Sequence, residues 1–171
     1  MRILRPLFHL AVIGLIVFAV YYFLIFPMLT VKAKVVHMYD PDSLLVLQDG
    51  VMEKVQLIGV DAPEMGGAER NIWQCYHREA EKQAAQLFAV EREVALETDD
   101  TLGDRDEHGR LLRYVRLADG QMLNEVLLRE GLAKEFHMDD SSYGKSDHFQ
   151  SLEKEAKEAD LGIWDECGGG F

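Results

Sequence analysis

Three carboxylates and one arginine stand where predicted strands give way to turns. They are Asp42 in DPDS (40–43), Asp61 and Glu64 in VQLIGVDAPE (55–64), and Arg110 in HGR (108–110). Carboxylates at strand ends can hold a hard cation through oxygen, and a nearby arginine can clamp a phosphate with two parallel hydrogen bonds. These residue types predict metal-assisted chemistry on a phosphodiester. Gln56 stands within the second segment and cannot add a second positive charge to such a clamp.

Short runs of apolar and β-branched residues surround these positions. They predict five strands, at 32–39, 43–49, 53–60, 93–99 and 111–118. Asp49-Gly50 is typical of a hairpin turn between the second and third strands. Helical spacing of apolar residues predicts three helices, at 77–92, 122–131 and 148–160. The charged segments 102–109 and 138–147 are expected to be loops.

The order of these elements predicts a small closed or nearly closed β-barrel with three helices packed on it. A five-strand Greek-key barrel of this size is an oligonucleotide- and oligosaccharide-binding architecture, the OB-fold. The barrel and its helices occupy residues 31–166, which is the length of one ordinary domain. Residues 167–171 are expected to be a C-terminal tail.

Residues 7–29 contain no charged side chain. About 20 apolar residues cross a bilayer as a helix, so this segment predicts a transmembrane anchor that contacts lipid, and a cleaved signal peptide is the alternative. Basic residues are nearly balanced across it, and only the short tail at 1–6 favours a cytoplasmic N-terminus. We therefore expect a single-pass protein of the cytoplasmic membrane with its C-terminal domain outside, or a secreted one after cleavage.

Two cysteines, Cys75 and Cys167, are present, and they have no metal-type spacing. An even count in an exported domain favours one disulfide. The disulfide would close a loop of about 90 residues and would add about 4–5 kcal/mol to the free energy of unfolding in the chain-entropy model. The alternative is a pair of buried, reduced thiols.

The domain is strongly acidic. It carries all 30 acidic residues but 16 of the 18 basic ones, because Arg2 and Arg5 precede the apolar segment, so its formal charge is −14. Nucleic-acid binding usually draws on a basic surface. A bound divalent cation and a local arginine cluster would have to overcome the repulsion.

The motifs from about 31 to 166 resemble the staphylococcal nuclease (thermonuclease-like) family. The resemblance lies in the order and spacing of D-x-D-S at 40–43, V-x-L-I-G-V-D-A-P-E at 55–64, C-Y-x-x-E-A at 75–80, D-x-x-G-R-L-L-R-Y-V at 106–115, L-N-E-V-L-L-R-E-G-L-A-K at 123–134 and L-G-I-W at 161–164. It implies a five-strand barrel with three helices. It also implies calcium-dependent cleavage of DNA and RNA, and we expect the protein to be a monomer.

The resemblance also implies roles for individual residues. Asp42 and Asp61 match the carboxylates that bind calcium, with the backbone carbonyl of Ala62 as a further ligand. Glu64 matches the general base that acts on the attacking water. Arg110 matches one of two arginines that clamp the phosphate.

This chain departs from the family pattern at several places. Gln56 occupies the position of the other clamp arginine, and losing one such arginine costs roughly 10³–10⁵ in rate by analogy with other phosphoryl-transfer sites. His108 and His137 stand where nucleotide-contacting tyrosines are expected, although a solvated loop position is an alternative for His108. Two further arginines could replace the missing one, namely Arg70 and Arg78.

Two classes of function remain open. The first is an extracytoplasmic nuclease, weakened by Gln56. The second is a catalytically impaired OB-fold module that binds calcium or a partner. Simpler structural roles also exist for the site residues: Asp42 could end a turn, and Arg110 could pair with Asp106 on its own loop.

Overall fold

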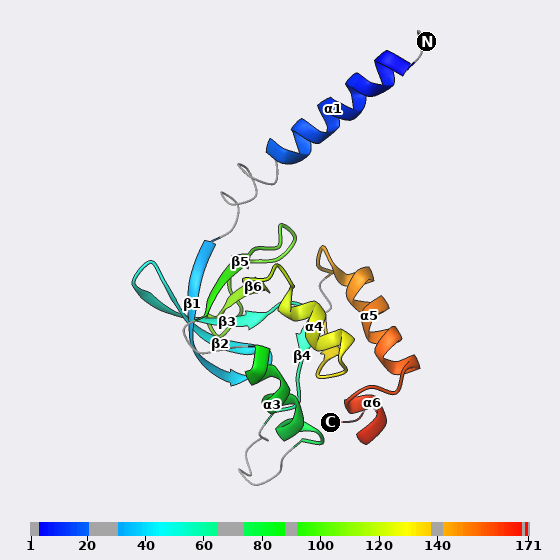
Figure 1. Ribbon diagram of the computed structural model, residues 1–171. Coiled ribbons are helices and arrows are strands. Elements are labelled where there is room, and N and C mark those ends of the chain that lie inside the picture. Colours follow the sequence, from blue (N-terminus) through cyan, green and yellow to red (C-terminus); the bar gives the residue numbers. More distant parts are fainter. Residues whose placement is uncertain are drawn as a thin grey trace. The chain divides into compact units, whose positions relative to one another are not determined.

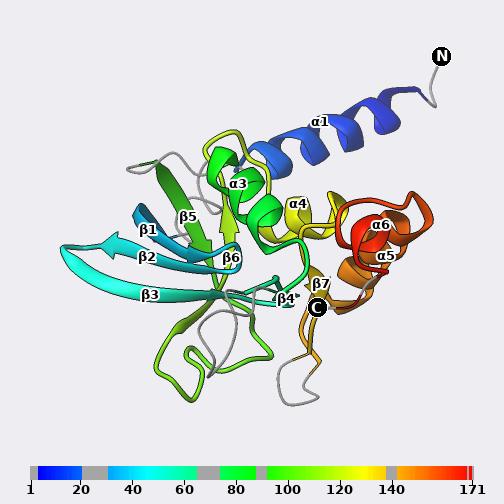
Figure 2. The same ribbon diagram turned by 90° about the horizontal axis from the view of Figure 1, so that it is seen from below.

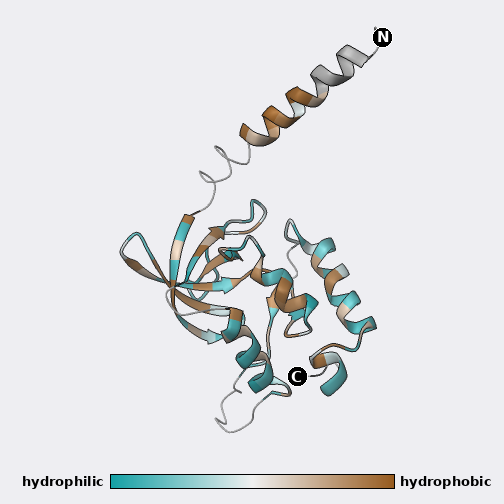
Figure 3. Ribbon diagram, in the orientation of Figure 1, coloured by the Kyte–Doolittle hydropathy of each residue, from teal (hydrophilic) through white to brown (hydrophobic). Residues whose placement is uncertain are grey.

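The computed structural model describes residues 4–20, 31–64, 74–87, 92–137, 142–168 and 170. The chain divides into two compact units, Met1–Val31 and Lys32–Phe171. In the first unit, helix α1 (Leu4–Val20) is apolar over its described side chains, and Figure 3 shows this part mainly brown. Among the helices in the described ranges, none is both long and apolar enough to cross a bilayer. The predicted span at 7–29 lies partly outside the described residues, beyond Val20.

Five strands close into a barrel in the second unit (Figure 1), which confirms the predicted architecture. They are β1 (Val31–Asp40), β2 (Ser43–Gln48), β3 (Val51–Leu57), β5 (Glu93–Glu97) and β6 (Leu111–Arg116). The order around the barrel is β1-β2-β3-β6-β5. The β3–β6 pair is parallel, whereas β1–β2, β2–β3 and β5–β6 are antiparallel. The parallel pair brings the β3 segment beside the strand that follows Arg110.

The hairpin between β2 and β3 turns at the predicted Asp49-Gly50 pair. Both residues have positive φ, 49° and 82°, which matches the tight turns that continue the right-handed twist of two strands. The turn sets the register in which Leu44 faces Val55, and both side chains are fully buried. Alternate residues of β2 and β3 therefore point into the barrel, and the residues between them point outward.

The predicted strand 53–60 is interrupted, because Gly59 bends the chain. Its φ is +72°, and a Cβ there would lie 2.5 Å from the ring of Tyr143. Glycine is therefore required both by conformation and by space. After the bend, β4 (Val60–Asp61) pairs with β7 (Lys134–Glu135) in a separate two-stranded sheet. β7 was not predicted, since two residues carry too little pattern.

The three predicted helices are present as α3 (His77–Leu87), α4 (Leu123–Arg129) and α5 (Ser146–Glu158). A further short helix, α6 (Ile163–Glu166), was not expected. The first predicted helix extends to residue 92. Of its last part, residues 88–91 lie outside the described residues, and Arg92 is not helical. Helix α4 packs against α5 and β6, and Figure 2 shows α4, α5 and α6 on the opposite side of the domain from the β1–β3 strands.

A disulfide joins Cys75 to Cys167, 92 positions apart. This confirms the predicted pairing and excludes the reduced-thiol alternative. Cys75 lies two residues before α3, and Cys167 directly follows α6. The bond therefore ties the start of α3 to the C-terminal end of the domain.

Candidate active site

A cavity of about 430 Å³ opens beside the end of β3. Six residues predicted from the sequence line it, namely Asp42, Gln56, Asp61, Glu64, His108 and Arg110. They come from the turn after β1, from β3, from the β4 segment and from the loop before β6. The barrel thus brings together residues that are nearly 70 positions apart in the sequence.

Asp42 is buried, with 3% of its surface exposed. Its Oδ2 accepts a hydrogen bond from the backbone N–H of Ala62 at 3.0 Å, and its backbone carbonyl accepts one from Leu57. Burial raises the pKa of Asp42 to about 7; the Ala62 N–H opposes this, and the carboxylates of Asp61, Asp40 and Glu64 add to it. The turn after β1 is therefore joined directly to the β4 segment.

The neighbouring carboxylates are also destabilised as anions. Burial raises the pKa of Asp61, and Lys134 opposes the effect from the neighbouring strand β7. Burial likewise raises the pKa of Glu64, and the charges of Asp40 and Asp61 add to it. Asp40 was not singled out from the sequence, although the D-x-D spacing placed it beside Asp42. Four carboxylates thus interact with one another, and three of them, Asp42, Asp61 and Glu64, line the cavity.

These residues fit a hard divalent cation. Carboxylate and carbonyl oxygens are the ligands that calcium prefers, and an acidic group as deeply buried as Asp42 needs a compensating charge. The described part of the chain contains no group of three or more acidic, histidine or cysteine side chains positioned around a metal. An ion held by Asp42, Asp61 and the carbonyl of Ala62 would therefore complete its shell with water.

The backbone around Glu64 is held by Gln74, just before α3, and by His77, the first residue of α3. The Glu64 N–H donates to Oε1 of Gln74 at 2.5 Å, and the Gln74 N–H donates to the Glu64 carbonyl at 3.3 Å. The buried ring of His77 contacts the Pro63 carbonyl through Nδ1 at 2.9 Å. Sequence reasoning missed both supporting residues, because neither Gln nor His at these positions carries a pattern of its own. The disulfide at Cys75 lies between them.

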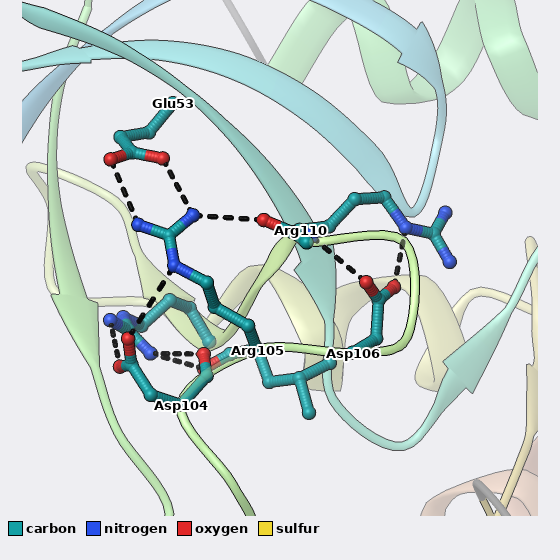
Figure 4. Close-up of polar contacts among 8 residues, drawn as sticks. Glu53, Asp104, Arg105, Asp106 and Arg110 are labelled. Atoms are coloured by element: carbon teal, nitrogen blue, oxygen red, sulfur yellow. Dashed lines mark hydrogen bonds and ion pairs between the residues drawn. The ribbon is translucent and has the colours of Figure 1, made fainter.

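Arg110 is fixed by two acceptors. Its Nε donates to Oδ2 of Asp106 at 2.6 Å, and its Nη1 donates to Oε1 of Gln56 at 2.5 Å. The other Asp106 oxygen accepts the backbone N–H of Arg110 at 2.8 Å. Figure 4 shows the Asp106 and Arg110 side chains directed at each other. Among the residues that the structure describes, none hydrogen-bonds Nη2 of Arg110, so this nitrogen remains available to a ligand.

A second arginine on the same loop is directed elsewhere. Arg105 lines the cavity, but its guanidinium forms a bidentate pair with Glu53 of β3, with both bonds at 2.9 Å. It also donates to the Gly109 carbonyl at 2.8 Å. In Figure 4 the guanidinium groups of Arg105 and Arg110 lie well apart. Arg105 therefore anchors the loop to the barrel, and that anchoring positions Arg110.

The other predicted site residues are placed differently. The side chain of His108 is exposed at the cavity, and the backbone N–H of His108 donates to Oδ1 of Asp106. His137 lies outside the cavity lining, where its Nε2 is 2.9 Å from both Glu135 and Ser146. Arg78, on α3, does not line the cavity. Arg70 lies outside the described residues. A half-exposed ring that the sequence did not single out, Phe136, does line the cavity.

Comparison with known proteins agrees with this geometry. The family model described as staphylococcal nuclease homologue matches residues 54–166. Endonuclease YncB of Bacillus subtilis is 35% identical over 130 residues, 75% of this chain and 59% of that protein. The SPbeta prophage-derived endonuclease YokF of the same organism is 35% identical over 130 residues, 75% of this chain and 42% of that protein. The thermonuclease of Staphylococcus hyicus is 32% identical over 132 residues, 77% of this chain and 74% of that protein. The chain spans about half the length of the two Bacillus relatives.

Proposed function

The chain belongs to the staphylococcal nuclease family, and we propose that it is a calcium-dependent nuclease that hydrolyses phosphodiester bonds in DNA and RNA. The observation that carries this proposal is the shared cavity: Glu64 and Arg110 line it together with the buried Asp42. A base, a phosphate clamp and oxygen ligands for a cation are the parts that such hydrolysis needs.

Each residue has a distinct task in this mechanism. The Glu64 carboxylate accepts a proton from the attacking water, and its raised pKa makes it a better proton acceptor than an ordinary glutamate. The Nη2 group of Arg110 donates to the phosphoryl oxygens, while Asp106 holds the other side of the guanidinium. A bound calcium ion would polarise the phosphoryl oxygen and offset the substrate charge.

A second candidate function follows from Gln56. It lines the cavity and bonds Arg110, yet it carries no charge at the position of the missing clamp arginine. Removing an arginine from a phosphoryl-transfer site costs roughly 10³–10⁵ in rate, and the acidic chain adds repulsion. The alternative is therefore a catalytically impaired OB-fold module that keeps the cation site and binds a partner.

We propose that the domain acts outside the cytoplasmic membrane, as a monomer. Two features support this location: the uncharged segment 7–29, which would contact the lipid bilayer, and the disulfide between Cys75 and Cys167. Disulfides form and persist in oxidising compartments. Secretion after cleavage of the N-terminal segment is the alternative. Protease accessibility of the domain in intact cells distinguishes an external from a cytoplasmic location.

The test is cleavage of single-stranded DNA by the full-length protein, with calcium and with chelator, beside the Glu64→Gln variant. Cleavage that requires calcium and disappears in the variant supports the nuclease. If nothing is cleaved while calcium still raises the melting temperature, the impaired binding module is supported instead. The absence of both effects would contradict both functions.

A further inference from the structure

The outward face of β1, β2 and β3 carries exposed basic and aromatic side chains together with apolar ones. We call this set the outer strip and define it as Lys34, His37, Tyr39, Leu47, Met52 and Lys54. The strand register places Lys34, Leu47 and Met52 in one row across the three strands, and His37, Leu45 and Lys54 in another. Figures 1 and 2 both show these strands on the side of the domain away from α5 and α6.

Three side chains of the outer strip, His37, Tyr39 and Lys54, contact one another. The Tyr39 ring, 43% exposed, packs edge-on against the ring of His37 at a centroid distance of 4.8 Å. The Lys54 ammonium lies 5.5 Å from the centre of the Tyr39 ring. An aromatic face next to ammonium groups is the combination that holds single-stranded nucleic acid, because bases stack on the ring and phosphates pair with the cations.

The charge of the outer strip differs from that of the rest of the domain. Arg105, Arg110 and Arg116 each pair with a carboxylate. By contrast, neither Lys34 nor Lys54 forms an ion pair with any residue in the described ranges. In a chain of net charge −12, uncompensated ammonium groups on one open sheet face provide local attraction for a polyanion.

The outer strip is continuous with the cavity. Lys54 lies two residues before Gln56 on β3, and both side chains belong to the outward face; Gln56 lines the cavity. A strand rises about 3.3 Å per residue, so the distance from Gln56 to Met52 is about 13 Å.

We propose that the outer strip is a second binding site, which holds the single-stranded polynucleotide beyond the phosphate that is cleaved. A base stacks on Tyr39, and Lys34 and Lys54 pair with successive phosphates. This inference rests on the proposed nuclease function, since it assumes that the cavity receives a phosphodiester. It explains how so acidic a protein retains a polyanionic substrate.

The experiment measures binding of a fluorescently labelled 16-nucleotide oligothymidine to full-length protein carrying Glu64→Gln, in chelator, at several salt concentrations. Tyr39→Ala should raise the dissociation constant about tenfold, in the range expected for one stacked base. The double change Lys34→Gln with Lys54→Gln should reduce the slope of log affinity against log salt by about 1.4, since each single-strand phosphate contributes about 0.7. The control, Lys82→Gln with Lys154→Gln, removes the same charge from α3 and α5 and should leave the slope unchanged.

A second measurement separates the two sites. With Glu64 intact and calcium present, the outer-strip variants should raise KM for a long strand and leave kcat/KM for a dinucleotide unchanged, because a dinucleotide fills only the cavity. Equal losses on both substrates, or equal slopes for the strip and control variants, would overturn the proposal. Binding that depends on the strip without any cleavage would instead contradict the nuclease function alone.

Discussion

Gln56 accepts a hydrogen bond from Nη1 of Arg110 at 2.5 Å, although 54 positions separate the two residues. The parallel pairing of β3 with β6 places them side by side, since Gln56 lies opposite Leu112. A guanidinium donates hydrogen bonds and cannot accept them, so this contact fixes the amide oxygen toward Arg110 and leaves the Gln56 Nε2 group as a donor on the other side. The neutral side chain of Gln56 therefore holds the guanidinium of Arg110 in place.

Replacing Gln56 by arginine tests whether charge limits the reaction. We expect Gln56→Arg to raise kcat/KM strongly, by roughly 10²-fold or more, because a second guanidinium stabilises the charged transition state. The measurement is the rate of single-strand cleavage with calcium. The control Gln56→Leu removes only the bond to Arg110 and should lower the rate about fivefold, the effect of one ordinary hydrogen bond. A rate no higher than wild type for Gln56→Arg would contradict this expectation.

Removing the support of Glu64 should slow catalysis without weakening substrate binding. In Gln74→Leu the Glu64 N–H loses its acceptor, and we expect kcat to fall about tenfold with KM unchanged, because the base is displaced from its productive geometry. The matched control is Gln83→Leu on α3, whose amide bonds the Tyr76 hydroxyl instead. If the two variants lost activity equally, Gln74 would have no specific role in holding Glu64.

Much of the fold was predictable because the long elements have strong patterns. The alternation in β2 and the Asp49-Gly50 turn fixed a hairpin that the structure confirms. The bend at Gly59 was not predictable, since the ring of Tyr143 that leaves no room for a Cβ there is more than 80 positions away. Short elements such as β7 and α6 depend on these long-range contacts and not on local pattern.

The residues of the site likewise include some that could be predicted from the sequence and some that could not. Residues whose chemistry is intrinsic, such as Asp42, Glu64 and Arg110, could be proposed from type and spacing, and the barrel places them at one cavity. The support of Glu64 by Gln74 could not be proposed, because Gln74 acts only through the geometry of two backbone segments. Asp106 could be proposed as a partner of Arg110, because the two residues share one loop, and the structure confirms the pair. From the sequence alone, the pairing of Arg110 with Asp106 is a structural alternative to a role in the site. The pair with Asp106 still allows Arg110 to act in the site, because Nη2 of Arg110 remains available to a ligand.

Opening the disulfide should destabilise the domain. The Cys75→Ser, Cys167→Ser double variant removes a cross-link between residues 92 positions apart, which contributes about 4–5 kcal/mol in the chain-entropy model. We expect the melting temperature to fall by about 10–20 °C, using the size scaling of domains of this length. Thermal unfolding of the variant, and of wild type with and without reductant, checks this. A melting temperature within a few degrees of wild type would contradict a structural role for the bond.

Stability at acidic pH should depend on Asp99. Partial burial acts to raise the pKa of Asp99, but hydrogen bonds from Thr101, Tyr114 and Gly144 lower it below its ordinary value. A lowered folded-state pKa stabilises the protein above the unfolded pKa, near 4, and this contribution is lost as pH falls through the folded value. The free energy of unfolding of wild type should therefore exceed that of Asp99→Asn by a constant amount above about pH 5. Denaturant titrations should show the difference shrinking below pH 4, and a difference that grew on acidification would contradict the assignment.

We propose that one cation, held at Asp42 and Asp61, serves the reaction at Glu64 and Arg110. The most direct measurement titrates calcium against two readouts on the same full-length protein, the rate of single-strand cleavage and the melting temperature. We expect the cleavage rate and the melting temperature to rise with the same half-saturating calcium concentration, and Asp42→Asn to weaken both effects together. Undiminished cleavage in chelator, or half-saturating concentrations that differ by more than tenfold, would contradict it.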